Sequence, residues 1–179
     1  MLAAMDQRSR ILVVEPNRTN LGVLARRLGE AGFQVVTAES GRTAIGELHR
    51  ARVDLVIAEM HMDRIDGVEL ARIIRDEAVW REVPVMLITG RSEPDDAVKA
   101  YQCGADDVIV KPFHFEVLIA KIERLLARAR AVETLRSDYA ALDARIVTRA
   151  IEIGEMRQRL FDSEADRRRL QMLVASKSA

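Results

Sequence analysis

Five short apolar runs between residues 11 and 110 constrain the fold of this chain more than any other feature. The segments between them carry apolar residues at spacings of three and four, which is typical of amphipathic helices. Strands that are apolar throughout are buried on both faces, and right-handed crossovers place helices on both sides of a parallel sheet. The alternation therefore predicts an α/β fold with a doubly wound, five-stranded parallel sheet. The predicted strands are 11–14, 35–36, 55–58, 85–88 and 108–110.

Glycine and proline divide the chain into two regions. Residues 10–112 hold all four prolines and every glycine except Gly154. Because these two residue types mark turns, the first region is expected to be compact and the second to have almost no turns. We predict an N-terminal arm at 1–9, an α/β domain at 10–131 and a helical extension at 132–179.

Several polar residues directly follow the predicted strands. Glu15 and Pro16 follow the first strand, Glu59 the third, Thr89 the fourth and Lys111 the fifth. In doubly wound sheets the functional crevice lies at the carboxyl ends of the strands, so these residues are expected to converge. Two carboxylates, a hydroxyl and an ammonium suit phosphate or metal chemistry, and they equally suit an inert salt-bridged cluster.

Six motifs follow one another along the chain: 11–17 (ILVVEPN) with Asn20, 54–62 (DLVIAEMHM), Asp66-Gly67, 84–89, 104–107 (GADD) and Lys111-Pro112-Phe113. With these motifs the chain resembles, over about residues 8 to 130, the receiver domain of two-component response regulators. The resemblance implies the flavodoxin-like strand order 2-1-3-4-5. It also implies phosphoryl transfer from a histidine kinase to an aspartate after the third strand, with Mg²⁺ bound by that aspartate and two acids after the first strand.

The resemblance places Glu59 at the phosphoacceptor position and Glu15 and Pro16 at the acidic-pocket positions. It places Thr89 and Lys111 at the hydroxyl and lysine positions. Pro16 has no side-chain ligand for Mg²⁺, and Glu59 is one methylene longer than aspartate. We therefore predict weak or absent Mg²⁺ binding, no cofactor and no normal phosphorylation, because phosphoryl transfer depends on positioning and charge neutralisation.

Two interpretations of Glu59 remain open. In the first, its carboxylate imitates the acyl phosphate and is held by Lys111 and Thr89, which fixes one signalling state. In the second, Glu59 pairs with Lys111 in a site that switches nothing. Val108 occupies the position of the family's switch aromatic and favours the second interpretation.

Other polar residues are predicted to be structural. His49, His61 and His114 share no metal-ligand spacing, so they are expected to be surface or packing residues and no metal site is predicted. Asp106 and Asp107 precede the fifth strand and are expected to cap or form a turn.

The region after residue 113 predicts one long helix. Residues 118, 122, 125, 129 and 132 follow a 4-3-4-3 spacing that fits the fifth helix of the receiver fold. A second apolar frame with a period of 3.5 residues follows, which predicts a coiled-coil seam and a parallel homodimer. The alternative is a hairpin hinged at Gly154 or near residues 137–138. The predicted seam comprises Leu135, Tyr139, Leu142, Ile146, Ile153, Met156, Leu160, Leu170 and Val174.

Composition excludes several classes of protein. The formal net charge of +0 gives no field that would attract nucleic acid or an anionic membrane. No apolar run reaches 18 residues, and the first ten residues carry no apolar signal segment, so we expect a cytoplasmic protein. A single cysteine excludes an intramolecular disulfide framework.

These observations predict a response-regulator-like signalling module, not an enzyme, that acts through protein–protein contacts and coiled-coil dimerisation without phosphorylation. Its protein partner, whether a histidine kinase or an output protein, is not identified. One alternative is a phosphorylated response regulator, or the regulatory half of a larger protein with a cyclic-dinucleotide or kinase output. Another is an RNA-binding antiterminator, which the sequence after residue 150 does not favour.

Overall fold

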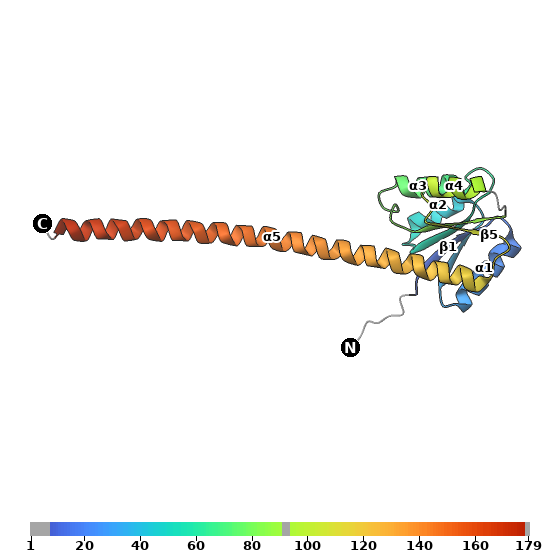
Figure 1. Ribbon diagram of the computed structural model, residues 1–179, viewed down its shortest axis with the longest axis horizontal. Helices are drawn as coiled ribbons and strands as arrows, with labels where there is room; N and C mark the ends of the chain where they lie inside the picture. Colours follow the sequence, from blue (N-terminus) through green and yellow to red (C-terminus); the bar gives the residue numbers. More distant parts are fainter. Residues whose placement is uncertain (1–7, 91–93, 178–179) are drawn as a thin grey trace. The chain divides into compact units, whose positions relative to one another are not determined.

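The computed structural model describes residues 8–90 and 94–177, which include a five-stranded parallel sheet (Figure 1). The strand order is β2-β1-β3-β4-β5, so the predicted topology is confirmed. The strands are β1 (Arg10–Val14), β2 (Gln34–Ala38), β3 (Leu55–Glu59), β4 (Val85–Thr89) and β5 (Asp107–Val110). The helices are α1 (Arg18–Glu30), α2 (Gly41–Arg50), α3 (Gly67–Asp76), α4 (Pro94–Gln102) and α5 (Phe115–Lys177).

Each face of the sheet has its own apolar core. Leu28 of α1 and Leu118 and Ile122 of α5 are buried on one face. Leu70 and Ile74 of α3 are buried on the other face, together with residues of α2 and α4. Figure 1 shows α2, α3 and α4 on one side of the sheet and α1 on the opposite side. This two-sided cover explains why the central strands carry almost no polar residues.

The edge strands differ from the prediction. Burial on both faces is confirmed for β1, β3 and β4, but it is wrong in extent for β2, where Val35 and Val36 are half-buried and the flanking Gln34 and Thr37 are exposed. It is also wrong for β5, where Val110 is exposed. Both are edge strands, which pair with a neighbour on one side only.

Local signals fix the loops that lead away from the carboxyl ends of β1 and β3. Asn17 caps α1, because its side chain accepts hydrogen bonds from the backbone N–H groups of Thr19 and Asn20 at 3.0 and 3.1 Å. After β3, a Cβ at position 67 would stand 2.5 Å from the carbonyl oxygen of Glu59. Only glycine fits this close approach, which holds the first turn of α3 against the end of β3.

Helix α5 continues without a break for 63 residues. The long helix is therefore confirmed, and the hairpin alternative is wrong, because Gly154 and residues 137–138 are helical. The chain divides into two compact units, Met1–Ala131 and Val132–Ala179. Seam residues such as Leu135, Leu142 and Ile146 are exposed in the single chain, whereas the side chains of Leu170 and Val174 lie outside the described residues.

Within residues 8–90 and 94–177, no helix combines the length and apolar character needed to cross a bilayer.

Candidate functional site

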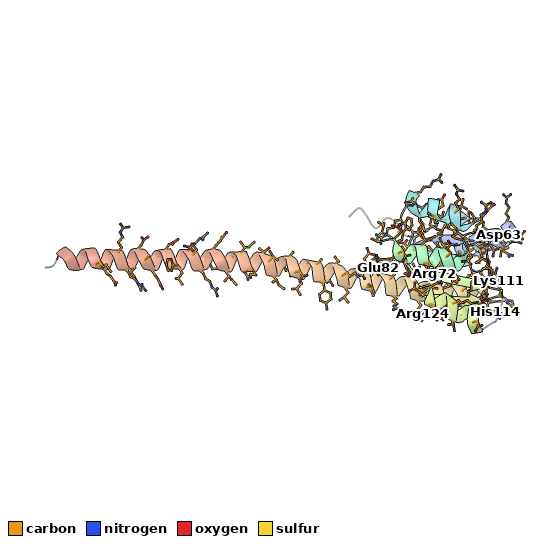
Figure 2. All side chains as sticks on the ribbon, turned by 90° about the horizontal axis from the view of Figure 1, so that it is seen from above. Asp63, Arg72, Glu82, Lys111, His114 and Arg124 are labelled. Atoms are coloured by element: carbon orange, nitrogen blue, oxygen red, sulfur yellow. The ribbon has the colours of Figure 1, made fainter. Side chains whose placement is uncertain are left out.

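Three of the predicted residues meet at the carboxyl ends of β1, β3 and β5. The ammonium of Lys111 donates to Oε2 of Glu15 at 2.8 Å and to Oε2 of Glu59 at 2.6 Å. Glu15 is 4% exposed, and the side chain of Glu59 is 12% exposed. Lys111 lies with Asp63 at the same end of the domain, while Glu82 lies at the other end (Figure 2). The structure therefore brings two carboxylates and an ammonium together at this edge of the sheet, as the sequence predicts.

Backbone contacts position these side chains. The N–H of Glu15 donates to the carbonyl of Ala38, and the N–H of Lys111 donates to the carbonyl of Thr89. The second carboxylate oxygen of Glu15 accepts the N–H of Asn17 at 3.0 Å. The strand that precedes Glu15 and the strand that precedes Lys111 therefore fix the positions of these two residues, which follow from the strand order.

The charges in this cluster are mutually dependent. Burial alone would lower the pKa of the Lys111 ammonium, because it disfavours the charged form. Hydrogen bonds to Glu15 and Glu59 outweigh burial and raise the pKa of Lys111 above its ordinary value. The lysine is thus held in its charged form between two carboxylates, and the trio keeps one net negative charge.

Thr89 ends β4 and is buried, and its hydroxyl donates to Oδ2 of Asp96 in α4 at 3.2 Å. His61, in the loop after β3, contacts the same oxygen through Nε2 at 3.0 Å. The hydrogen bond to His61 holds the pKa of Asp96 below its usual value, against the effect of burial. The contact between Lys111 and Glu59, which both interpretations of Glu59 expect, is present, whereas the hydroxyl hydrogen of Thr89 goes to Asp96.

Two other predicted positions, Pro16 and Val108, contribute no polar group to this cluster. Pro16 follows Glu15 and is exposed. Val108 lies in β5, pairs in register with Leu87 and packs its half-buried side chain against the core beneath α2, α3 and α4. His49 stacks edge-on against Trp80 at 4.6 Å between ring centroids, which confirms a packing role.

These residues do not fit a Mg²⁺ ion. Mg²⁺ requires near-octahedral oxygen coordination in an acidic pocket. Here the two carboxylates already share an ammonium, and Pro16 offers no ligand. Among the described residues, no group of three or more His, Cys, Asp or Glu side chains could hold a metal ion.

A second buried cluster was not foreseen in the sequence. Asp107, expected to cap or form a turn, is instead the first residue of β5 and is buried. Its carboxylate accepts hydrogen bonds from Lys121 and Arg124 of α5, each at 2.8 Å. Burial acts to raise the pKa of Asp107, but the hydrogen bond from Lys121 and the other polar contacts hold it below the ordinary value. The cluster attaches the start of α5 to the sheet.

Residues 11–123 match the family model of the response regulator receiver domain. The transcriptional regulatory protein PrrA of Mycobacterium leprae is 36% identical over 133 residues, which cover 74% of this chain and 56% of PrrA. The response regulator MprA of Mycobacterium bovis is 32% identical over 170 residues, which cover 93% of this chain and 72% of MprA. The chain thus spans about half the length of PrrA.

Solved structures agree with the family match. The signal receiver domain of a signal transduction histidine kinase from Syntrophus aciditrophicus is 38% identical, with a TM-score of 0.63. The match covers 66% of this chain and 90% of that one. The chemotaxis protein CheY4 of Vibrio cholerae is 26% identical, with a TM-score of 0.63 over 66% of this chain and 98% of that one.

Proposed function

The chain belongs to the response regulator receiver family of two-component signalling, and from that premise we propose that it signals through protein–protein contacts without phosphoryl transfer. The carrying observation is the pair of hydrogen bonds from Lys111 to Glu15 and Glu59. In the family, the corresponding lysine is a phosphate contact. In this chain, its charge is already neutralised by two carboxylates of the same pocket.

Phosphoryl transfer to this pocket is disfavoured for two physical reasons. The transferred group needs a metal ion or a free cation to neutralise its charge, and positioning supplies most of the remaining catalysis. The pocket already carries one net negative charge, so an incoming phosphoryl group would meet repulsion. The longer side chain of Glu59 also places its carboxylate against Lys111, where the phosphate would need to be.

Acetyl phosphate with Mg²⁺ tests this proposal. We expect the unaltered chain to keep its mass, because the pocket lacks an aspartate and a full set of metal ligands. The double variant Glu59→Asp, Pro16→Asp restores both and is expected to gain the mass of one phosphoryl group. Intact-mass spectrometry measures this, with Glu59→Gln, Pro16→Asp as the matched control that lacks a nucleophile. Uptake by the unaltered chain would contradict the proposal.

We further propose that α5 pairs in parallel with a second copy. In heptad terms, Tyr139, Ile146 and Ile153 occupy a positions, and Leu135 and Leu142 occupy d positions. β-branched residues at a with leucine at d favour parallel two-stranded coiled coils. The exposure of these side chains in the single chain supports a partner, because an isolated helix with an exposed apolar seam is marginal in water.

Cysteine cross-linking tests the parallel pairing. A Leu142→Cys variant is expected to form a disulfide-linked dimer under oxidised glutathione, because d positions face their own copies across a parallel seam. Non-reducing electrophoresis measures the linked fraction. Asp162→Cys, outside the seam, is the control, and the unaltered chain reports any contribution from the buried Cys103. Equal cross-linking of the two variants would argue against a parallel seam.

A second candidate function is that of the phosphorylated regulatory half of a transcriptional regulator. This candidate is favoured because the similar protein PrrA is named a transcriptional regulatory protein, and the chain matches only 56% of its length. The acetyl phosphate experiment separates the two candidates, because only this second one expects the unaltered chain to be modified.

A further inference from the structure

Helix α5 carries a second apolar stripe that the parallel dimer leaves uncovered. At 3.6 residues per turn, this stripe lies about 150° around the helix from the seam. Positions on that side of a two-stranded coiled coil face water and are ordinarily polar. Here Val147 and Ile151 are each 59% exposed, and Phe161 is 68% exposed. The stripe comprises Ala140, Ala144, Val147, Ile151, Gly154 and Phe161, with spacings of three, four or seven residues.

Two charged residues beside this stripe have no ion-pair partner at helical spacing on their own helix. Asp143 and Arg157 lie between the stripe and the seam, and ion pairs within a helix join residues three or four apart. All the residues at those spacings are apolar side chains, tyrosine or glycine. They are Tyr139, Ala140, Ile146 and Val147 around Asp143, and Ile153, Gly154, Leu160 and Phe161 around Arg157.

In the parallel seam alone, Asp143 and Arg157 face residues of different charge. In a parallel dimer, each g residue faces the e residue five positions later in the other copy. Asp143 would therefore face Asp138, a like charge, whereas Arg157 would face Glu152. The parallel partner therefore offers Asp143 no cation.

We propose that the second stripe binds another copy of the same helix in antiparallel orientation, so that two parallel dimers join into a tetramer, whose two outer stripes can add further dimers in the same way. The register places Ala150 opposite Ala150 of the other copy. Asp143 then lies beside Arg157 of the other copy, and the symmetry of the pair repeats this contact. Val147 packs against Ile151 near the centre, while Ala144 meets Gly154, where small residues allow the helices to approach closely.

Charge selects this register over its neighbours. A shift of one heptad in one direction would place Arg136 beside Arg157. A shift in the other direction would place Asp143 beside Glu164. Both alternatives bring like charges together across the apolar stripe, which is the usual way in which helical pairs exclude wrong registers.

Sedimentation equilibrium of the full chain tests the proposal. Each parallel dimer carries two such stripes on opposite sides, so we expect masses of four or more 20.1 kDa chains, falling to two on dilution. The Ile151→Glu variant is expected to lose the tetramer and keep the dimer, because it places a charge in the second stripe only. An unaltered chain that stays dimeric at all concentrations would overturn the second pairing.

Charge reversal gives a sharper test with its own control. Asp143→Arg alone and Arg157→Asp alone are each expected to abolish the tetramer, and the double reversal to restore it. If these charges acted only across the parallel seam, Asp143→Arg would strengthen association and Arg157→Asp would weaken it. That opposite pair of effects, or a double reversal that fails to restore the tetramer, would overturn the proposal.

The tetramer rests on the proposed parallel dimer, and the same measurement separates their failures. If the chain forms only a dimer, and Leu142→Glu abolishes it while Ile151→Glu leaves it intact, the parallel seam is supported and the second pairing is overturned. A dimer with the reverse behaviour supports the antiparallel pairing and overturns the parallel one. A monomeric chain overturns both.

Discussion

Replacement of Lys111 by methionine is expected to lower the free energy of unfolding by about 3–5 kcal/mol at neutral pH, the range for breaking a buried ion pair by removing one partner. Glu15 and Glu59 both contact the Lys111 ammonium, and both are largely shielded from water. Without the ammonium, two carboxylates would share one pocket with no cation between them. One of them must then take up a proton or move toward solvent, and either change destabilises the fold.

The loss should depend on pH in a defined direction. At pH 5 the variant can protonate one carboxyl at lower cost, so its deficit relative to the unaltered chain should shrink. In the unaltered chain the raised pKa of Lys111 contributes stability that is complete below its unfolded pKa of about 10.4. That contribution is lost as the pH rises through the folded pKa.

Urea denaturation at pH 5 and 7.5 measures both effects. Lys99→Met, at an exposed position of α4, is the matched control and is expected to change stability by less than about 0.5 kcal/mol. Adding Glu59→Gln to Lys111→Met should recover part of the loss, because it removes one of the two opposed charges. A Lys111→Met deficit that equals the control at both pH values would show that the cluster is not electrostatically coupled.

The fold and the centre of the site could be predicted because both follow from topology. Apolar runs and helical spacings define parallel strands, and the carboxyl ends of such strands meet at one edge. Glu15, Glu59 and Lys111 each stand directly at a strand end, so only the strand order was needed to bring them together.

The contacts that could not be predicted depend on how helices pack. The hydroxyl of Thr89 reaches Asp96 because α4 lies beside the end of β4, and no spacing in the sequence sets that distance. The sequence predicts that Asp107 caps or forms a turn, because aspartate side chains readily hydrogen-bond nearby backbone groups. Its real partners, Lys121 and Arg124, are three residues apart and so share one face of α5, next to the buried Leu118 and Ile122. In the sequence, a lysine and an arginine three residues apart beside an apolar stripe were the signal for this contact.

Arg75 joins two loops at the far end of the sheet, and its replacement by methionine is expected to cost about 3–4 kcal/mol, since hydrogen bonds from a charged group contribute about 1.5–3 kcal/mol each and are not additive. Its Nε donates to the carbonyl of Gly104 at 2.8 Å, and Nη1 donates to the carbonyls of Arg81 and Val83 at 2.9 and 2.8 Å. Its Nη2 contacts Asp106 at 2.7 Å. The guanidinium therefore holds the segment before β4 and the turn before β5 to α3.

A lysine at position 75 is expected to recover little of this loss, because its single ammonium cannot reach four acceptors on two separate loops. Urea denaturation measures both variants. Arg72→Met, one helical turn earlier on α3 and exposed, is the matched control (Figure 2). Full recovery of the free energy of unfolding in Arg75→Lys would mean that a positive charge near Asp106 is sufficient to hold the two loops. Loss with both substitutions at 75, and none at 72, would show that the planar arrangement of donors positions these loops, and with them the starts of β4 and β5.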